Sequence, residues 1–249
     1  MTMIPLPAKI ETVLLSLLNP DCAWHRWRSG TNLRLMTRMK AWRRAGYLEG
    51  VTHLLDAGAN EGAFARAWQT IRPETKSLCF EPVPETHARM VARCRSVPAI
   101  TPVRMALGAE PGRLQMNVGA FHEANSLLPM NPTHVEHWPS SAPSGVVDVD
   151  VWRLDDYLRS QSVSGTYFLK ADVQGFELQL FRGATETLKR TPLLQVEISL
   201  VPLYRDAPDL ADLWRYLEPL GYRLLDVADL LLSPQTGKPV SCDLLFERR

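Results

Sequence analysis

Short apolar runs alternate along most of the chain with segments whose apolar positions have helical spacing. Runs of strand length lie at 53–56, 77–81, 100–106, 167–172, 193–198, 222–227 and 243–246. After the first run, Phe64 and Trp68 are four residues apart, as on one face of a helix, and Met90 lies in a similar segment after the second run. This alternation is typical of a mostly parallel sheet with helices on both faces, so we predict one doubly wound α/β domain over residues 49–249.

The first 48 residues have a different pattern. Apolar positions at 10–18 recur at helical spacing until Pro20, and residues 22–48 contain seven Lys or Arg residues and no acid. Apolar residues interleave with these charges, and the segment stops near Gly46. We therefore expect an N-terminal helical extension, ending in a basic amphipathic helix that packs on the domain.

Regularity breaks between about residue 112 and residue 153. Residues 113–118 and 146–152 alternate between polar and apolar positions like edge strands, and a segment rich in Pro and His at 123–144 separates them. A loop of that length in a compact domain usually serves as a lid or a binding loop. We expect a β-rich insert whose loop helps to shape an acceptor pocket.

Composition and charge narrow the classes of function. The 249 residues are 45% hydrophobic and 22% charged, enough for one core, and 28 basic residues nearly balance 27 acidic ones. A net charge of +1 gives no global field to attract nucleic acid, and no apolar run approaches the roughly 18 residues of a spanning helix. We expect a cytoplasmic protein with no transmembrane segment and no nucleic-acid partner.

Carboxylates occur where the predicted parallel strands end. The four positions are Asp56, Glu81, Asp172 and Glu197. In open α/β sheets, ligands bind outside the carboxyl ends of the strands, near the point where the strand order reverses. The sequence therefore predicts that these acids converge on one site.

The turn after the first predicted strand has the spacing Asp56-x-Gly58-x-Asn60-x-Gly62, which allows a sharp turn and a close approach of a ligand to the backbone. The G-x-G-x-x-G spacing of dinucleotide-binding folds is absent, which disfavours a NAD-linked oxidoreductase. Glu81, at the end of the second strand, is placed to accept hydrogen bonds from both hydroxyls of a ribose.

Six segments, in this order, resemble the FkbM-type methyltransferases, a branch of the class I fold that depends on S-adenosylmethionine. They are 55–62, 80–85, 106–108, 154–158, 169–177 and 196–199. The resemblance runs from about Leu33 to the C-terminus, and the block at 170–177 is its most specific part. It implies a Rossmann-like sheet of seven strands, the last antiparallel, and methyl transfer to a hydroxyl of a sugar, glycan or natural product.

The same resemblance implies roles for individual residues around the cofactor. The methionine part is surrounded by Asp56, Gly58, Asn60 and Gly62, the ribose is bound by Glu81, and the adenine lies beside Met105 and Ala106. Many related enzymes have an acid where this chain has Ala106, so adenine contacts at that position would come from the backbone.

Asp172 is the first candidate for a general base that removes the acceptor's proton. Asp172 and Glu197 could instead bind Mg²⁺, because carboxylates at adjacent strand ends can supply oxygen ligands. Lys170 precedes Asp172 by two residues, so both side chains share one face of a strand, and Lys170 is predicted to orient the carboxylate. The sequence leaves these roles open, and a binding module without catalysis remains an alternative.

Overall fold

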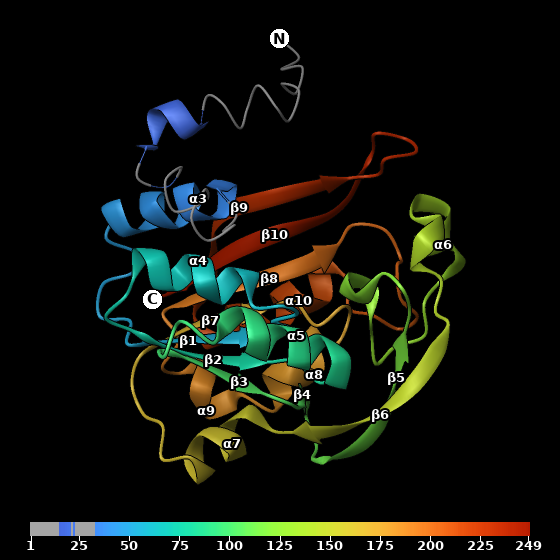
Figure 1. Cartoon of the computed structure of the whole chain (residues 1–249), viewed down its shortest axis with the longest axis horizontal. Helices are drawn as coiled ribbons and strands as arrows, with labels where there is room; N and C mark the ends of the chain where they lie inside the picture. Colours follow the sequence, from blue (N-terminus) through green and yellow to red (C-terminus); the bar gives the residue numbers. More distant parts are fainter. Residues whose placement is uncertain (1–14, 21, 23–32) are drawn as a thin grey trace.

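The computed structural model describes residues 15–20, 22 and 33–249 (Figure 1). Most of the helix predicted at 10–18, and the first part of the basic segment, lie outside the described residues. The rest of that segment forms helix α3, Leu33–Arg44, whose buried face is Leu33, Met36, Met39 and Trp42. These side chains share one apolar cluster with the central sheet, so the division into an extension and a domain stays a prediction.

A seven-stranded sheet has the order β3-β2-β1-β7-β8-β10-β9. The strands are β1 His53–Ala57, β2 Lys76–Phe80, β3 Ile100–Val103, β7 Tyr167–Ala171, β8 Leu193–Ser199, β9 Tyr222–Leu232 and β10 Pro239–Arg248. The first five strands of this order are parallel, and β10 runs antiparallel to both its neighbours. The predicted doubly wound sheet of seven strands is confirmed, and the strand order reverses between β1 and β7.

Helices cover both faces of this sheet (Figure 1). On one face α3 packs with α4, Ala63–Ile71, and α5, Pro84–Cys94, against alternate side chains such as Leu54 and Phe168. The other face carries α7 Leu154–Ser160, α8 Glu177–Arg182, α9 Thr185–Leu188 and α10 Leu210–Leu217, followed by the short η3 Glu218–Leu220. Because both faces are buried, consecutive residues in the parallel strands are apolar, such as Leu54 and Leu55 of β1 or Phe168 and Leu169 of β7, and do not alternate with polar ones.

The insert contains a second, three-stranded sheet. Its strands are β4 Ala106–Leu107, β5 Gly112–Val118 and β6 Gly145–Trp152, in the order β4-β6-β5. The strand predicted at 100–106 was therefore too long, because the chain leaves the main sheet after Val103 and Ala106 pairs with Val151. The long loop holds η1 His122–Ala124, α6 Pro132–His137 and η2 Pro139–Ser141.

No helix in the described part of the chain is both long enough and apolar enough to cross a bilayer.

Candidate active site

A cavity of about 540 Å³ opens at the carboxyl ends of the parallel strands and is bounded by α3, the insert and β10. Its walls include eight of the ten predicted site residues: Gly58, Asn60, Glu81, Met105, Ala106, Lys170, Asp172 and Glu197. Asp56 and Gly62 are not among its lining residues. Three of the four carboxylates that the sequence places at strand ends, Glu81, Asp172 and Glu197, therefore line one cavity with the insert, and the fourth, Asp56, does not.

The turn after β1 is left-handed at three of its residues, with φ +75° at Gly58, +48° at Asn60 and +76° at Gly62. A Cβ on Gly58 would lie 1.7 Å from the carbonyl oxygen of Asp172, so only glycine fits there. A Cβ on Gly62 would meet the Cys94 sulfur at 2.6 Å. Gly62 thus serves the packing of the turn on α5 and does not face the cavity.

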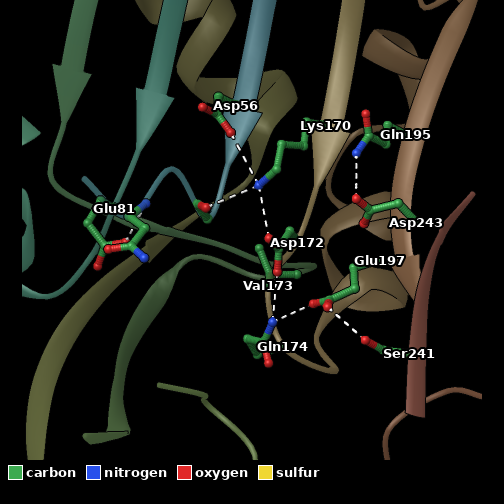
Figure 2. Close-up of polar contacts among 12 residues, drawn as sticks. Asp56, Glu81, Lys170, Asp172, Val173, Gln174, Gln195, Glu197, Ser241 and Asp243 are labelled. Carbon is green, nitrogen blue, oxygen red and sulfur yellow. Dashed lines mark hydrogen bonds and ion pairs between the residues drawn. The ribbon is translucent and has the colours of Figure 1, made fainter. Parts of the chain in front are cut away.

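Asp56 lies behind the cavity wall. Its side chain is fully buried, and its Oδ1 is 3.5 Å from Lys170 Nζ (Figure 2). Burial raises the pKa of Asp56, although the Lys170 ammonium opposes the shift. Asp56 therefore influences the cavity only through Lys170. The resemblance placed Asp56 beside the methionine part of the cofactor, but its side chain does not line the cavity.

Glu81 faces the cavity at the end of β2, with 7% of its surface exposed. The backbone N–H groups of Asn60 and Val83 donate to its two carboxylate oxygens at 3.1 and 3.0 Å. Burial raises the pKa of Glu81 to about 7, despite these hydrogen bonds. Each carboxylate oxygen has two lone pairs, so the fixed carboxylate can still accept hydrogen bonds from a diol in the cavity.

Lys170, Asp172 and Glu197 form a polar group across β7 and β8 (Figure 2). Lys170 Nζ donates to Asp172 Oδ2 at 3.1 Å and to the carbonyl oxygen of Gly58 at 3.3 Å. Burial opposes the charge of Lys170, but the carboxylates of Asp172 and Asp56 outweigh it and raise the pKa of Lys170. Lys170 therefore stays protonated and forms ion pairs with the carboxylates of both Asp56 and Asp172.

The pKa values of the two carboxyls at this site are shifted in opposite directions. Burial alone would raise the pKa of Asp172, but the Lys170 ammonium and hydrogen bonds from Glu197 and Gln174 outweigh burial and lower it. Burial, and then the negative charge of Asp172, raise the pKa of Glu197 well above its usual value. The pair therefore favours a single negative charge on Asp172, because two adjacent carboxylates repel each other.

Gln174 is a site residue that the sequence analysis missed. It has a left-handed backbone, φ +53°, and its Nε2 donates to Asp172 Oδ1 at 2.8 Å and to Glu197 Oε2. Its Oε1 accepts from the hydroxyl of Tyr204 at 2.8 Å. Only its place in the turn after a strand could have drawn attention to it, because Tyr204 lies 30 residues away.

The insert loop closes over this group from one side. Ser126 Oγ donates to the carbonyl oxygen of Gln174 at 2.6 Å, and both His122 and Asn125 line the cavity. His134 is 3% exposed and its Nδ1 lies 2.8 Å from Ser141 Oγ, so it is part of the packing of the loop. The expectation that the loop shapes the pocket is consistent with these contacts.

The predicted Mg²⁺ site does not fit these residues. Lys170 Nζ already occupies the space beside Asp172 Oδ2, and Gln174 and Ser241 donate hydrogen bonds to Glu197. Mg²⁺ requires oxygen ligands in octahedral geometry, and a neighbouring ammonium repels it. Among the described residues, no group of three or more His, Cys, Asp or Glu side chains could hold a metal ion. We therefore derive no step through Mg²⁺.

The sequence of this chain matches the model of one protein family. The family described as Methyltransferase FkbM domain matches residues 56–224, which include every predicted site residue. The 2-O-methyltransferase NoeI of Sinorhizobium fredii is 26% identical over 162 residues, covering 61% of this chain and 65% of NoeI. The hexuronic acid methyltransferase AglP of Haloferax volcanii is 26% identical over 146 residues, covering 58% of this chain and 55% of AglP.

The chain thus spans less than two thirds of the length of these two relatives. A solved structure described as a SAM dependent methyltransferase from Aquifex aeolicus covers 86% of this chain and 91% of its own, with a TM-score of 0.42 and 14% identity. That likeness is too distant to assign a function.

Proposed function

Since this chain belongs to the family of FkbM-domain methyltransferases, we propose that it transfers a methyl group from S-adenosylmethionine to a hydroxyl oxygen of a sugar, glycan or natural product. The observation that carries the proposal is that one cavity contains two sites: the carboxylate of Glu81, held by two backbone N–H groups, and the carboxylate of Asp172, held by Lys170 and Gln174. The name of NoeI, a 2-O-methyltransferase, supports an oxygen acceptor, and that of AglP, a hexuronic acid methyltransferase, supports a carbohydrate.

The cofactor end of the cavity fits an adenosyl sulfonium compound. The buried Asn60 Oδ1 has no hydrogen-bond partner among the described residues. Gly58 lines the cavity, and its lack of a side chain lets the turn lie directly against the backbone of Asp172. In the proposal, Glu81 binds the ribose hydroxyls, Met105 and Ala106 flank the adenine, and residues 57–60 lie against the methionine part. When bound, the cofactor supplies a methyl group on a positively charged sulfur.

At the other end, Asp172 receives the proton that the acceptor hydroxyl loses as its oxygen forms the new bond to carbon and the sulfur–carbon bond breaks. The lowered pKa of Asp172 keeps it deprotonated beforehand. The attacking oxygen becomes more acidic as its bond to the methyl carbon forms, so it can then give up its proton. Lys170 and Gln174 are positioning residues that hold the two carboxylate oxygens of Asp172. The walls orient the acceptor in line with the sulfur–carbon bond.

Calorimetric titration tests the cofactor assignment. We expect S-adenosylmethionine and S-adenosylhomocysteine to bind, and Glu81→Ala to weaken both by about 1.5–3 kcal/mol, the range for hydrogen bonds to a charged group. If neither compound at millimolar concentration gives a heat of binding, the proposal is wrong. If NAD gives a heat of binding instead, the protein is better explained as an oxidoreductase. Binding with no turnover on a broad panel of hydroxyl acceptors would favour a non-catalytic module.

Cofactor binding should tighten as the pH rises through about 7. Burial raises the pKa of Glu81 to about 7, and only its ionised form can accept from both ribose hydroxyls with the strength of a charged acceptor. Binding therefore releases a proton, and affinity should increase about tenfold between pH ~6 and pH ~8. Titrations in buffers of different ionisation enthalpy measure the proton release. Glu81→Gln is the matched control, and an equal pH dependence in that variant would show that another group is responsible.

A further inference from the structure

A row of polar side chains crosses the main sheet beyond Asp172, on the face that α3 and α4 cover. Lys170 of β7 is in register with Gln195 of β8, and Gln195 Nε2 donates to Asp243 Oδ2 of β10 at 3.0 Å (Figure 2). Asp243 is in turn in register with Asp229 of β9. All four residues line the cavity. Farther along the same strands, this face carries apolar residues such as Leu193, so the polar row needs a separate reason.

One acceptor in this row of polar side chains, the amide oxygen of Gln195, has no hydrogen-bond donor among the described residues. The residue is 2% exposed, and its Oε1 is buried with no hydrogen-bond partner among the described residues. The bond from its Nε2 to Asp243 fixes the amide, because a flipped amide would place two acceptor oxygens together. Buried polar atoms without partners are rare in folded proteins, and one that lies in a cavity wall points to a ligand group. The missing group is a donor, such as a hydroxyl.

The charges at this end of the cavity do not favour an anion. The acids are Asp172, Glu197, Asp229 and Asp243, and the bases are Lys170, Arg34 and Arg38. Arg38 lies 3.7 Å from Asp229, and Lys170 contacts two carboxylates, so Arg38 and Lys170 already have acidic neighbours. The excess of acceptor oxygens is suited to a ligand with several hydroxyl donors and no negative charge.

We propose that Gln195, Ser241 and Asp243 form the acceptor subsite and bind neighbouring hydroxyls of a neutral sugar unit, while an adjacent hydroxyl faces Asp172. Gln195 Oε1 and the carboxylate of Asp243 accept hydrogen bonds from two hydroxyls. Ser241, whose Oγ donates to Glu197 Oε1 at 3.2 Å, connects the subsite to the carboxyl pair. Leu35 and Leu231 supply apolar wall against the C–H groups of a sugar ring. This inference rests on the proposed function, because it assigns the second substrate of the same reaction.

The test uses the full chain saturated with S-adenosylhomocysteine and four probes: the methyl glycosides of glucose, mannose and fucose, and glucuronate. Saturation-transfer NMR measures binding, and formation of S-adenosylhomocysteine from S-adenosylmethionine measures turnover. We expect at least one neutral glycoside to bind more tightly than glucuronate. Asp243→Asn and Gln195→Met should each weaken that glycoside, seen as a higher Kd or KM by roughly tenfold to a hundredfold for Asp243→Asn, with cofactor affinity unchanged.

The matched control is Asp148→Asn, the same substitution at an exposed position of β6, and this variant should bind and turn over like the parent. Ser241→Ala is the milder subsite variant if Asp243→Asn lowers the melting temperature. Three results overturn the inference: no glycoside binds a protein that does bind S-adenosylhomocysteine, glucuronate binds best, or folded Asp243→Asn and Gln195→Met retain the parent KM. Failure to bind S-adenosylhomocysteine would instead overturn the proposed function.

Discussion

Asp172→Asn is expected to lower turnover by roughly 10²–10⁴-fold, the usual contribution of a general base, with cofactor affinity nearly unchanged. The amide cannot take up a proton from the acceptor hydroxyl, and it leaves the buried Lys170 ammonium with one carboxylate partner in place of two. The side chain keeps its shape and can still accept from Lys170. Single-turnover measurement of methyl transfer separates this chemical step from binding.

Glu197→Gln is the matched variant for Asp172. Its amide can still donate a hydrogen bond to Asp172, and it adds no second negative charge beside that carboxylate, so turnover should fall by only about tenfold or less. A chelator should leave the parent enzyme active, because Lys170 stands where a metal ion would need to approach Asp172. Full activity of folded Asp172→Asn on the acceptor that the parent methylates would defeat the base assignment and leave orientation as the main source of catalysis.

Gly58→Ala is expected to cost about 2–5 kcal/mol of unfolding free energy and to abolish measurable cofactor binding. The residue has φ +75°, and its new Cβ would lie 1.7 Å from the carbonyl oxygen of Asp172. That backbone cannot easily move, because Asp172 N donates to the carbonyl oxygen of Ala57 at 3.1 Å and Gly58 N donates to that of Phe80 at 3.1 Å. Denaturant unfolding and calorimetry measure the two effects.

Gly50→Ala separates backbone strain from the clash. Gly50 has a similar φ of +71°, but nothing lies within 4 Å of a Cβ at that position. It should therefore lose only about 1–2 kcal/mol, the strain of a left-handed alanine, and keep cofactor binding. If Gly58→Ala and Gly50→Ala lower the unfolding free energy equally, then the turn after β1 can move to accommodate the added methyl group. In that case the close approach of Gly58 to the end of β7 is not needed.

Local pattern and chain direction were enough to predict the sheet and the edge at which the cavity lies. Mainly apolar runs such as residues 167–169 at the start of β7 identify strands buried on both faces, and a polar residue at the end of such a strand, as at Glu81 and Asp172, must lie at the carboxyl edge. The need for glycine at 58 was also visible, because a sharp turn there requires a residue without a side chain.

Only the tertiary structure decided which polar groups meet. The sequence placed Asp56 at the cofactor, but strand register puts it beside Lys170 and behind the wall. Ala106 pairs with a strand of the insert, which no local periodicity could indicate. The Gln195–Asp243 contact joins residues 48 positions apart in strands that pair antiparallel. Such contacts depend on register and on packing between distant segments, whereas periodicity and turn chemistry act over a few residues and are therefore readable from the sequence alone.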